Sequence, residues 1–126
     1  MTSYMVAVAV LLIAVVAQAG DYRPAGSSTP HMIASGTIAL NTTLVTTATC
    51  GTAQTATATG AATTDVIVWT FNADYSATTG YTPATTGGLS LMVYPTANTV
   101  NVKVCNPTGS DITPGAAVTL NWKVLR

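Results

Sequence analysis

The sequence predicts an all-β protein, an antiparallel β-sandwich of Ig-like or jelly-roll-like Greek-key form, preceded by a hydrophobic N-terminal helix or signal segment. Short apolar stretches, several of them alternating with a period of two, recur about every ten residues and are separated by Gly, Pro and Asn turns. Only 6% of the residues are charged and 48% are hydrophobic, so the composition predicts a chain that folds around a core.

The chain is expected to form one folding domain, because 126 residues are too few for two. Residues 1–19 form a hydrophobic N-terminal segment, residues 20–32 a linker, and residues 33–126 the β-sandwich domain. The linker includes DYRPAGSSTP, whose prolines, glycine and hydroxyl side chains favour turns.

The N-terminal segment contains an unbroken apolar run at residues 6–16. This is the length of a signal-peptide core and is shorter than the about 20 residues of a membrane-spanning helix. Ala17-Gln18-Ala19 then matches the small-x-small pattern of a signal-peptidase site, which favours cleavage after Ala19, although MTSYM lacks the usual Lys or Arg. The alternative is a retained helix over residues 2–19, about 27 Å long, that inserts in a membrane or a filament core.

Seven strands are expected in the rest of the chain. The first two, 33–40 and 44–50, are separated by a turn at Asn41-Thr42-Thr43, and the third, 54–59, alternates Thr with Ala and so presents a face of small side chains. The segment 66–72, VIVWTFN, is apolar on both faces, which predicts a central strand that is buried on both sides or faces a partner.

The last three strands follow a long polar loop. Segments 89–94 and 100–105 form a hairpin across PTAN, and in the second of them Val100, Val102 and Val104 point inward while Asn101 and Lys103 point outward. The final strand has an apolar inner face made of Val118, Leu120, Trp122 and Val124.

Cys50 and Cys105 are the only two cysteines, and their even number and the export context favour one disulfide over two separate thiols. The bond closes a loop of about 55 residues and stabilises the fold by about 4 kcal/mol in the chain-entropy model. By analogy with an Ig domain, the pair resembles the bridge between two sheets, with Trp69 in the place of the core tryptophan.

Two resemblances concern larger parts of the chain. The segments VNVKVCNPT and ITPGAAVTLNWKV, within the last forty or so residues, resemble the C-terminal part of small uncharacterised bacterial and phage-encoded proteins. This resemblance implies no functional residues. A hydrophobic N-terminal helix followed by a β-domain is similar to the architecture of pilin subunits. The chain contains no glutamate, however, whereas type IV pilins have one near the start of the helix.

The sequence predicts no enzyme, no metal site and no cofactor. The four cationic and four acidic residues are scattered singly, which gives neither a basic patch for nucleic acid nor a carboxylate pair for hydrolysis. His31 is the only histidine and is expected in solvent or in packing, and Asp65, Asp74 and Asp111 are expected in turns.

Binding to glycans is a weaker hypothesis. Tyr75, Tyr81 and Tyr94 around the long loop are candidates for a sugar-stacking platform, against the alternative that they cap the sandwich edge. Asn41 begins the N-glycosylation sequon Asn41-Thr42-Thr43.

The predicted function is that of a structural subunit of a filament or pilus-like assembly, secreted or on the cell surface, whose partners are copies of itself. Residues 1–19 are expected to contact a membrane only transiently. Alternatives are a virion decoration or fibre protein and a secreted carbohydrate-binding module. The residues expected to mediate assembly, either in a helical core or by donating the strand HMIASGTIAL to a neighbour, are Val6, Val8, Val10, Leu11, Leu12, Ile13, Val15, Val16, Ile33, Ile38 and Leu40.

Overall fold

The computed structural model describes residues 29–82 and 88–126, and all of its regular structure is β-strand. The hydrophobic segment 1–19 and most of the linker therefore lie outside the described residues. Among the residues that are described, no helix is long and apolar enough to cross a membrane. The strands are β1 (Met32–Ala39), β2 (Thr49–Cys50), β3 (Gln54–Thr57), β4 (Val66–Phe71), β5 (Ser90–Thr96), β6 (Thr99–Asn106) and β7 (Thr119–Leu125).

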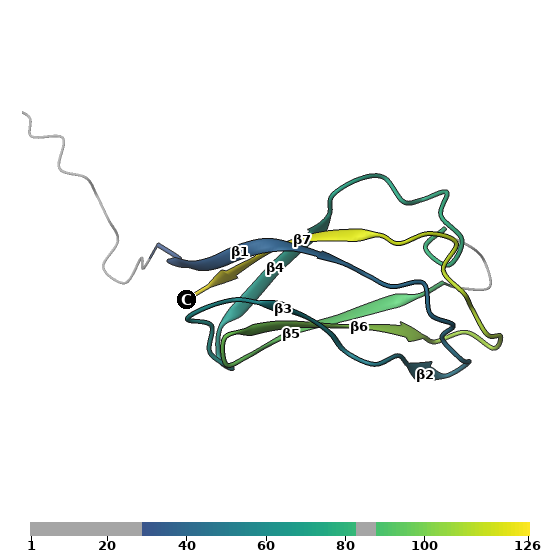
Figure 1. Cartoon of the computed structure of the whole chain (residues 1–126), viewed down its shortest axis with the longest axis horizontal. Coiled ribbons are helices and arrows are strands. Elements are labelled where there is room, and N and C mark those ends of the chain that lie inside the picture. The colour runs from purple at the N-terminus through teal and green to yellow at the C-terminus, as the bar shows by residue number, and fades with distance from the viewer. Residues whose placement is uncertain (1–28, 83–87) are drawn as a thin grey trace, which may run out of the picture.

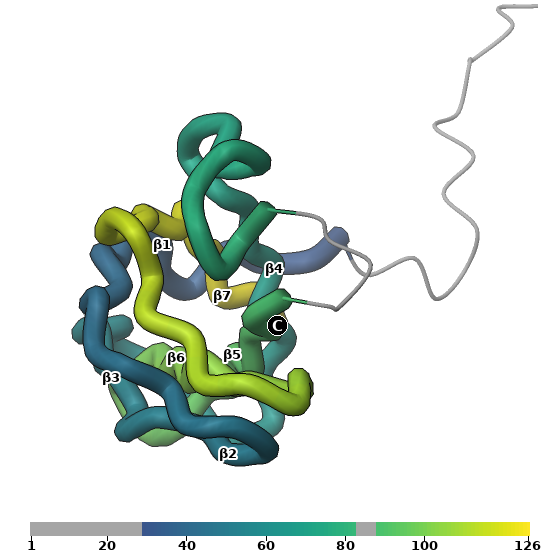
Figure 2. The backbone as a smooth tube through the Cα atoms, turned by 90° about the vertical axis from the view of Figure 1, so that its right-hand side faces the viewer, coloured from purple at the N-terminus to yellow at the C-terminus, as the bar shows by residue number. Residues whose placement is uncertain are grey.

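The strands form two antiparallel sheets in two layers, which confirms the all-β prediction (Figure 1; Figure 2 shows the layers end-on). One sheet has the order β1-β7-β4. In the other, β6 pairs with β5 on one side and with β2 and β3 on its other side. Every connection except β2 to β3 and β5 to β6 passes from one sheet to the other. As a result β7, the last strand in the chain, lies at the centre of the first sheet.

The core lies between the sheets and contains the inner faces that the sequence predicts for β6 and β7. Val100, Val102 and Val104 of β6 are buried, and they face the buried apolar residues of the last segment, which are Val118, Leu120, Trp122 and Val124. Asn101, which the sequence predicts to point outward, is nevertheless buried, and its side-chain amide is satisfied by hydrogen bonds to the Tyr94 carbonyl at 3.3 Å and the Thr96 hydroxyl at 2.9 Å.

Two predicted strands differ in the structure. The segment 66–72 is not central: β4 lies at the edge of its sheet and pairs only with β7. The segment 44–50 is not one strand, because Val45 forms an isolated bridge with Ile112 and the chain turns at Ala48, whose φ is 54°. Only Thr49 and Cys50 then pair with β6.

The Cys50–Cys105 disulfide is present, but it joins neighbouring strands of one sheet, so the analogy with the inter-sheet bridge of an Ig domain is wrong. Cys50 lies directly opposite Cys105, with the Cα atoms 3.9 Å apart. Because Val104 points into the core, its neighbour Cys105 points to the outer face of the sheet. Trp69 is half-buried on β4 in the other sheet.

Candidate functional site

Several of the large apolar side chains that are exposed lie together on the outer face of the β1-β7-β4 sheet. Val66 is 60% exposed, Val68 is 49% exposed and Met32 is 53% exposed. The register of β7 places them together, since Leu125 pairs with both Met32 and Val66. We call Met32, Val66, Val68 and Leu125 the outer apolar surface. Contiguous exposed apolar side chains of this kind mark interaction sites on soluble domains.

The outer apolar surface ends in a depression at one end of the sheet. Pro30, Val66, Leu125 and Arg126 line this depression, whose volume is about 230 Å³. The backbone of His31 exchanges hydrogen bonds with that of Arg126, at 2.8 and 3.0 Å, and so fixes this end of the sheet. His31 itself is exposed directly before β1, which agrees with the solvated alternative of the two positions that the sequence predicts for it, in solvent or in packing.

An ion pair holds the start of β4 in place beside this surface. Nε of Arg126 donates to Oδ1 of Asp65 at 2.8 Å, and an Nη of Arg126 donates to Oδ2 at 2.9 Å. The same carboxylate accepts the Ala62 N–H at 2.9 Å, so Asp65 also closes the turn that the sequence predicts for it. These hydrogen bonds lower the pKa of Asp65 below its usual 3.8, and hydrogen bonding from Arg126 has a larger effect than that from Ala62.

Replacing Asp65 with Asn is expected to lower the melting temperature at pH 7, because the charged hydrogen bonds to Arg126 are lost. A carboxyl group with a lowered pKa stabilises the fold fully above its unfolded pKa and loses this effect as the pH falls through the folded pKa. The difference in melting temperature between the variant and the unaltered protein should therefore begin to narrow once the pH falls below 3.8, the usual pKa of the carboxyl group. Thermal unfolding monitored by circular dichroism at pH 2 to 7 measures both curves, and a difference that is as large at pH 2 as at pH 7 would contradict this role of Asp65.

The three tyrosines proposed for sugar stacking do not come together. Tyr94 lies on β5 opposite Asn101, in the four-stranded sheet. Tyr75 and Tyr81 both pack edge-on against Phe71, with ring centroids 5.8 and 6.0 Å apart, at the end of β4. The Tyr75 hydroxyl donates to Oδ1 of Asn72 at 2.9 Å, and burial raises the pKa of Tyr81.

Phe71, Tyr75 and Tyr81 nevertheless line a depression of about 240 Å³ together with Asp74 and Ser76. Oδ1 of Asp74 accepts the Ser76 N–H at 2.9 Å, which is the Asx-turn that the sequence predicts. The third predicted turn residue, Asp111, instead accepts the N–H of Thr47 from another loop at 2.8 Å.

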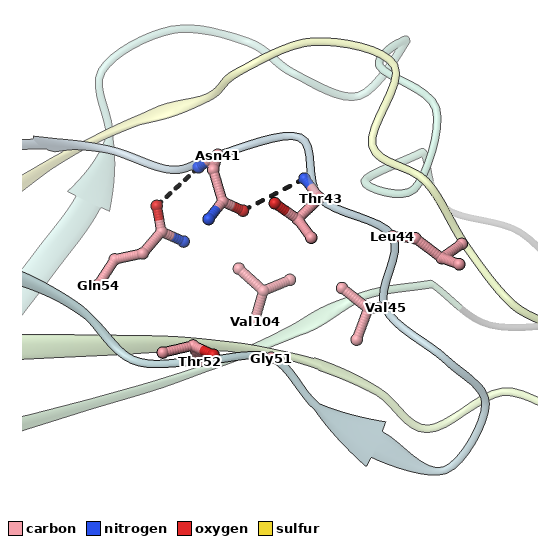
Figure 3. A pocket seen from close by; sticks show the side chains of 8 residues that line it. All are labelled: Asn41, Thr43, Leu44, Val45, Gly51, Thr52, Gln54 and Val104. Carbon is pink, nitrogen blue, oxygen red and sulfur yellow. Dashed lines mark hydrogen bonds between the residues drawn. The ribbon is translucent and has the colours of Figure 1, made fainter.

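Asn41 borders a smaller pocket of about 100 Å³ between its own loop and β6 (Figure 3). Its backbone N–H donates to Oε1 of Gln54 at 2.7 Å, and its side-chain Oδ1 accepts the Thr43 N–H at 3.3 Å. Val45 and Val104 form the apolar part of the lining. Asn41 is exposed, as a glycosylated residue must be, and its glycosylation stays a prediction.

The structure also places the predicted assembly residues that it describes. Ile38 and Leu40 are 7% and 1% exposed and belong to the core of this chain, and Ile33 is half-buried against it. HMIASGTIAL therefore lies largely in β1, paired with β7 of the same chain. The other predicted assembly residues, Val6, Val8, Val10, Leu11, Leu12, Ile13, Val15 and Val16, lie outside the described residues.

The described residues contain no group of three or more His, Cys, Asp or Glu side chains that could hold a metal ion. The sequence analysis places Met32 in a linker and leaves open whether the strand with Val66 and Val68 is buried on both sides or faces a partner, so it does not identify the outer apolar surface. The sequence signal for this surface is in VIVWTF, which is apolar on both faces, so that a second layer is needed to cover the outer one.

Comparison of the chain with protein-family models, with curated proteins and with solved structures finds no match.

Proposed function

We propose that this protein is a non-enzymatic structural subunit of an extracellular or cell-surface assembly, filament-like or pilus-like, in which each chain binds copies of itself. The observation that supports the proposal best is the outer apolar surface on a chain with a formal net charge of zero. Only eight side chains of the whole chain, four cationic and four acidic, are charged at neutral pH. Such a surface has little charge repulsion to keep two copies apart.

The disulfide supports an oxidising location and a rigid subunit. Structural disulfides persist outside the cytoplasm, and Cys50–Cys105 ties the short strand β2 to the central strand β6. In this proposal the two layers form an Ig-like or jelly-roll-like sandwich. Residues 1–19 either act as a signal peptide or stay and insert in the core of the filament.

Assembly of the oxidised full chain tests this function. We expect particles much larger than one chain by negative-stain electron microscopy and by light scattering, and intact-mass analysis of the native protein shows whether residues 1–19 are retained. Protein that remains monomeric at about 1 mM would contradict the proposal.

A second candidate, a secreted carbohydrate-binding module, is supported by the depression lined by Phe71, Tyr75 and Tyr81. Aromatic faces beside polar side chains such as Asp74 and Ser76 are suited to sugar rings. This candidate predicts a monomer that is retained on a polysaccharide column, and replacing Tyr75 with Ala should abolish the retention.

A further inference from the structure

The four edges of the two sheets differ in how they resist pairing with another chain. β1 has a register shift between Met32 and Ala34, and β5 contains Pro95, which lacks an N–H. The edge formed by β2 and β3 is interrupted at residues 51–53. These are features by which proteins protect edge strands.

β4 has none of these features. It pairs with β7 without a register shift from Val66 to Phe71, and its sequence, VIVWTF, contains no charge, proline or glycine. A regular, apolar edge strand of this kind is a template for adding another strand.

The hydrogen-bonding groups at this edge can be assigned from the ladder. The N–H of Asn72 donates to the Thr119 carbonyl of β7 at 3.0 Å. Because successive residues of a strand alternate their backbone groups between its two sides, Thr70, Val68 and Val66 also face β7. The N–H and C=O groups of Ile67, Trp69 and Phe71 therefore face outward, and no described residue bonds to them.

We propose that β4 pairs with β4 of a second copy of this chain, antiparallel, with Trp69 opposite Trp69. This inference rests on the proposed function and names the surface through which two copies meet. Ile67 then lies opposite Phe71 of the second copy, and the three hydrogen-bonded pairs give about six hydrogen bonds. The two sheets become one continuous sheet with the order β1-β7-β4-β4-β7-β1.

The hydrogen-bonding pattern favours this occupant and this register. The three outward-facing residues are symmetric about Trp69, so antiparallel self-pairing uses all of their groups. A register in which each partner moves by two residues, with Val68 opposite Val68, would place Phe71 opposite Asp65, whose N–H is already bonded to the Ala62 carbonyl at 3.2 Å. The ring of Phe71, which is 38% exposed, gains Ile67 of the second copy as a neighbour.

The pairing joins two chains about a two-fold axis and is closed, so a longer polymer needs another contact as well. The N-terminal segment is the contact that the proposed function supplies. The β4 seam joins two strands of six residues each, and a seam this short favours weak association, so the association is best followed over concentrations that reach about 1 mM.

Substitutions on the exposed side of β4 test the pairing without touching the core. In the proposed register Val68 lies opposite Thr70 of the second copy. The double variant Val68→Glu/Thr70→Glu places like charges opposite each other twice across the seam. Glu at position 68 lies beside Lys123 of its own chain, which favours the folded monomer. We expect the dissociation constant to rise at least about tenfold, measured by sedimentation equilibrium.

Two further variants make the result specific. Val68→Glu/Thr70→Lys places opposite charges across the seam and should restore the association. Ser35→Glu/Thr37→Glu puts the same two glutamates on β1, where positions 35 and 37 also lie opposite Lys123 and Asn121, and should leave it unchanged. In the unaltered protein, the amides of Ile67, Trp69 and Phe71 should exchange with solvent at least tenfold more slowly at high than at low concentration.

The outcomes separate this inference from the proposed function. An unaltered protein that stays monomeric overturns both. If the unaltered protein assembles and Val68→Glu/Thr70→Glu assembles equally well, the β4 pairing is wrong while self-assembly stands. If the double-glutamate variant dissociates and Val68→Glu/Thr70→Lys does not recover, the occupant of the edge is not β4 of a second copy.

Discussion

Removal of the Cys50–Cys105 disulfide is expected to lower the free energy of unfolding by about 4 kcal/mol, as given by the loop-entropy model for a separation of 55 residues. The bond constrains the unfolded chain, and in the folded chain it holds β2, which has only two residues in register with β6. Urea denaturation at pH 7, with and without a reductant, measures the change.

The matched control is the double variant Cys50→Ala/Cys105→Ala. It should show the same loss as the reduced protein and should not respond to the reductant. A reduced protein that unfolds at the same urea concentration as the oxidised one would contradict the stabilising role of the bond.

Replacement of Trp122 with Ala is expected to lower the free energy of unfolding by about 3–5 kcal/mol, because a large buried ring is lost and a cavity remains. Trp122 is 4% exposed on β7, between its register partners Gly36 of β1 and Trp69 of β4. Its indole N–H is buried and meets no hydrogen-bond partner among residues 29–82 and 88–126. Trp122→Phe, which removes that N–H, should therefore cost less than Trp122→Ala. Urea denaturation compares the two.

The position of the indole ring explains Gly36. A Cβ at residue 36 would lie 2.6 Å from Cζ2 of Trp122, so the ring occupies the space of a side chain. Gly36→Ala should cost about 1–3 kcal/mol by overpacking. The cost should shrink in a Trp122→Phe background, which a double-mutant cycle measures. Equal costs in both backgrounds would show that the contact with Trp122 is not the reason for the glycine.

The sequence was sufficient for features that depend on local alternation. The buried faces of β6 and β7 follow from Val100, Val102 and Val104 and from the period-two pattern ending at Val124. The pairing of the only two cysteines was also predictable from their number. Strand limits were close for β1, where 33–40 was expected and Met32–Ala39 is found.

Features that depend on distant parts of the chain were not predictable in this way. The edge position of β4 follows from β7 taking the centre of the sheet, which nothing within 66–72 specifies. At the break in 44–50, Asp111 of another loop accepts the N–H of Thr47, a contact that nothing within 44–50 specifies. For the candidate site, the apolar character of β4 was evident in the sequence, but its exposure was not. The sequence also could not show that the fold places Tyr94 away from Tyr75 and Tyr81.

The central claim is that this protein functions by binding copies of itself. Sedimentation of the oxidised full chain at neutral pH, over a concentration series that reaches about 1 mM, tests it most directly. The account predicts a weight-average mass that rises with concentration to at least twice the 12.8 kDa of one chain. A mass that stays at one chain throughout the series would contradict it.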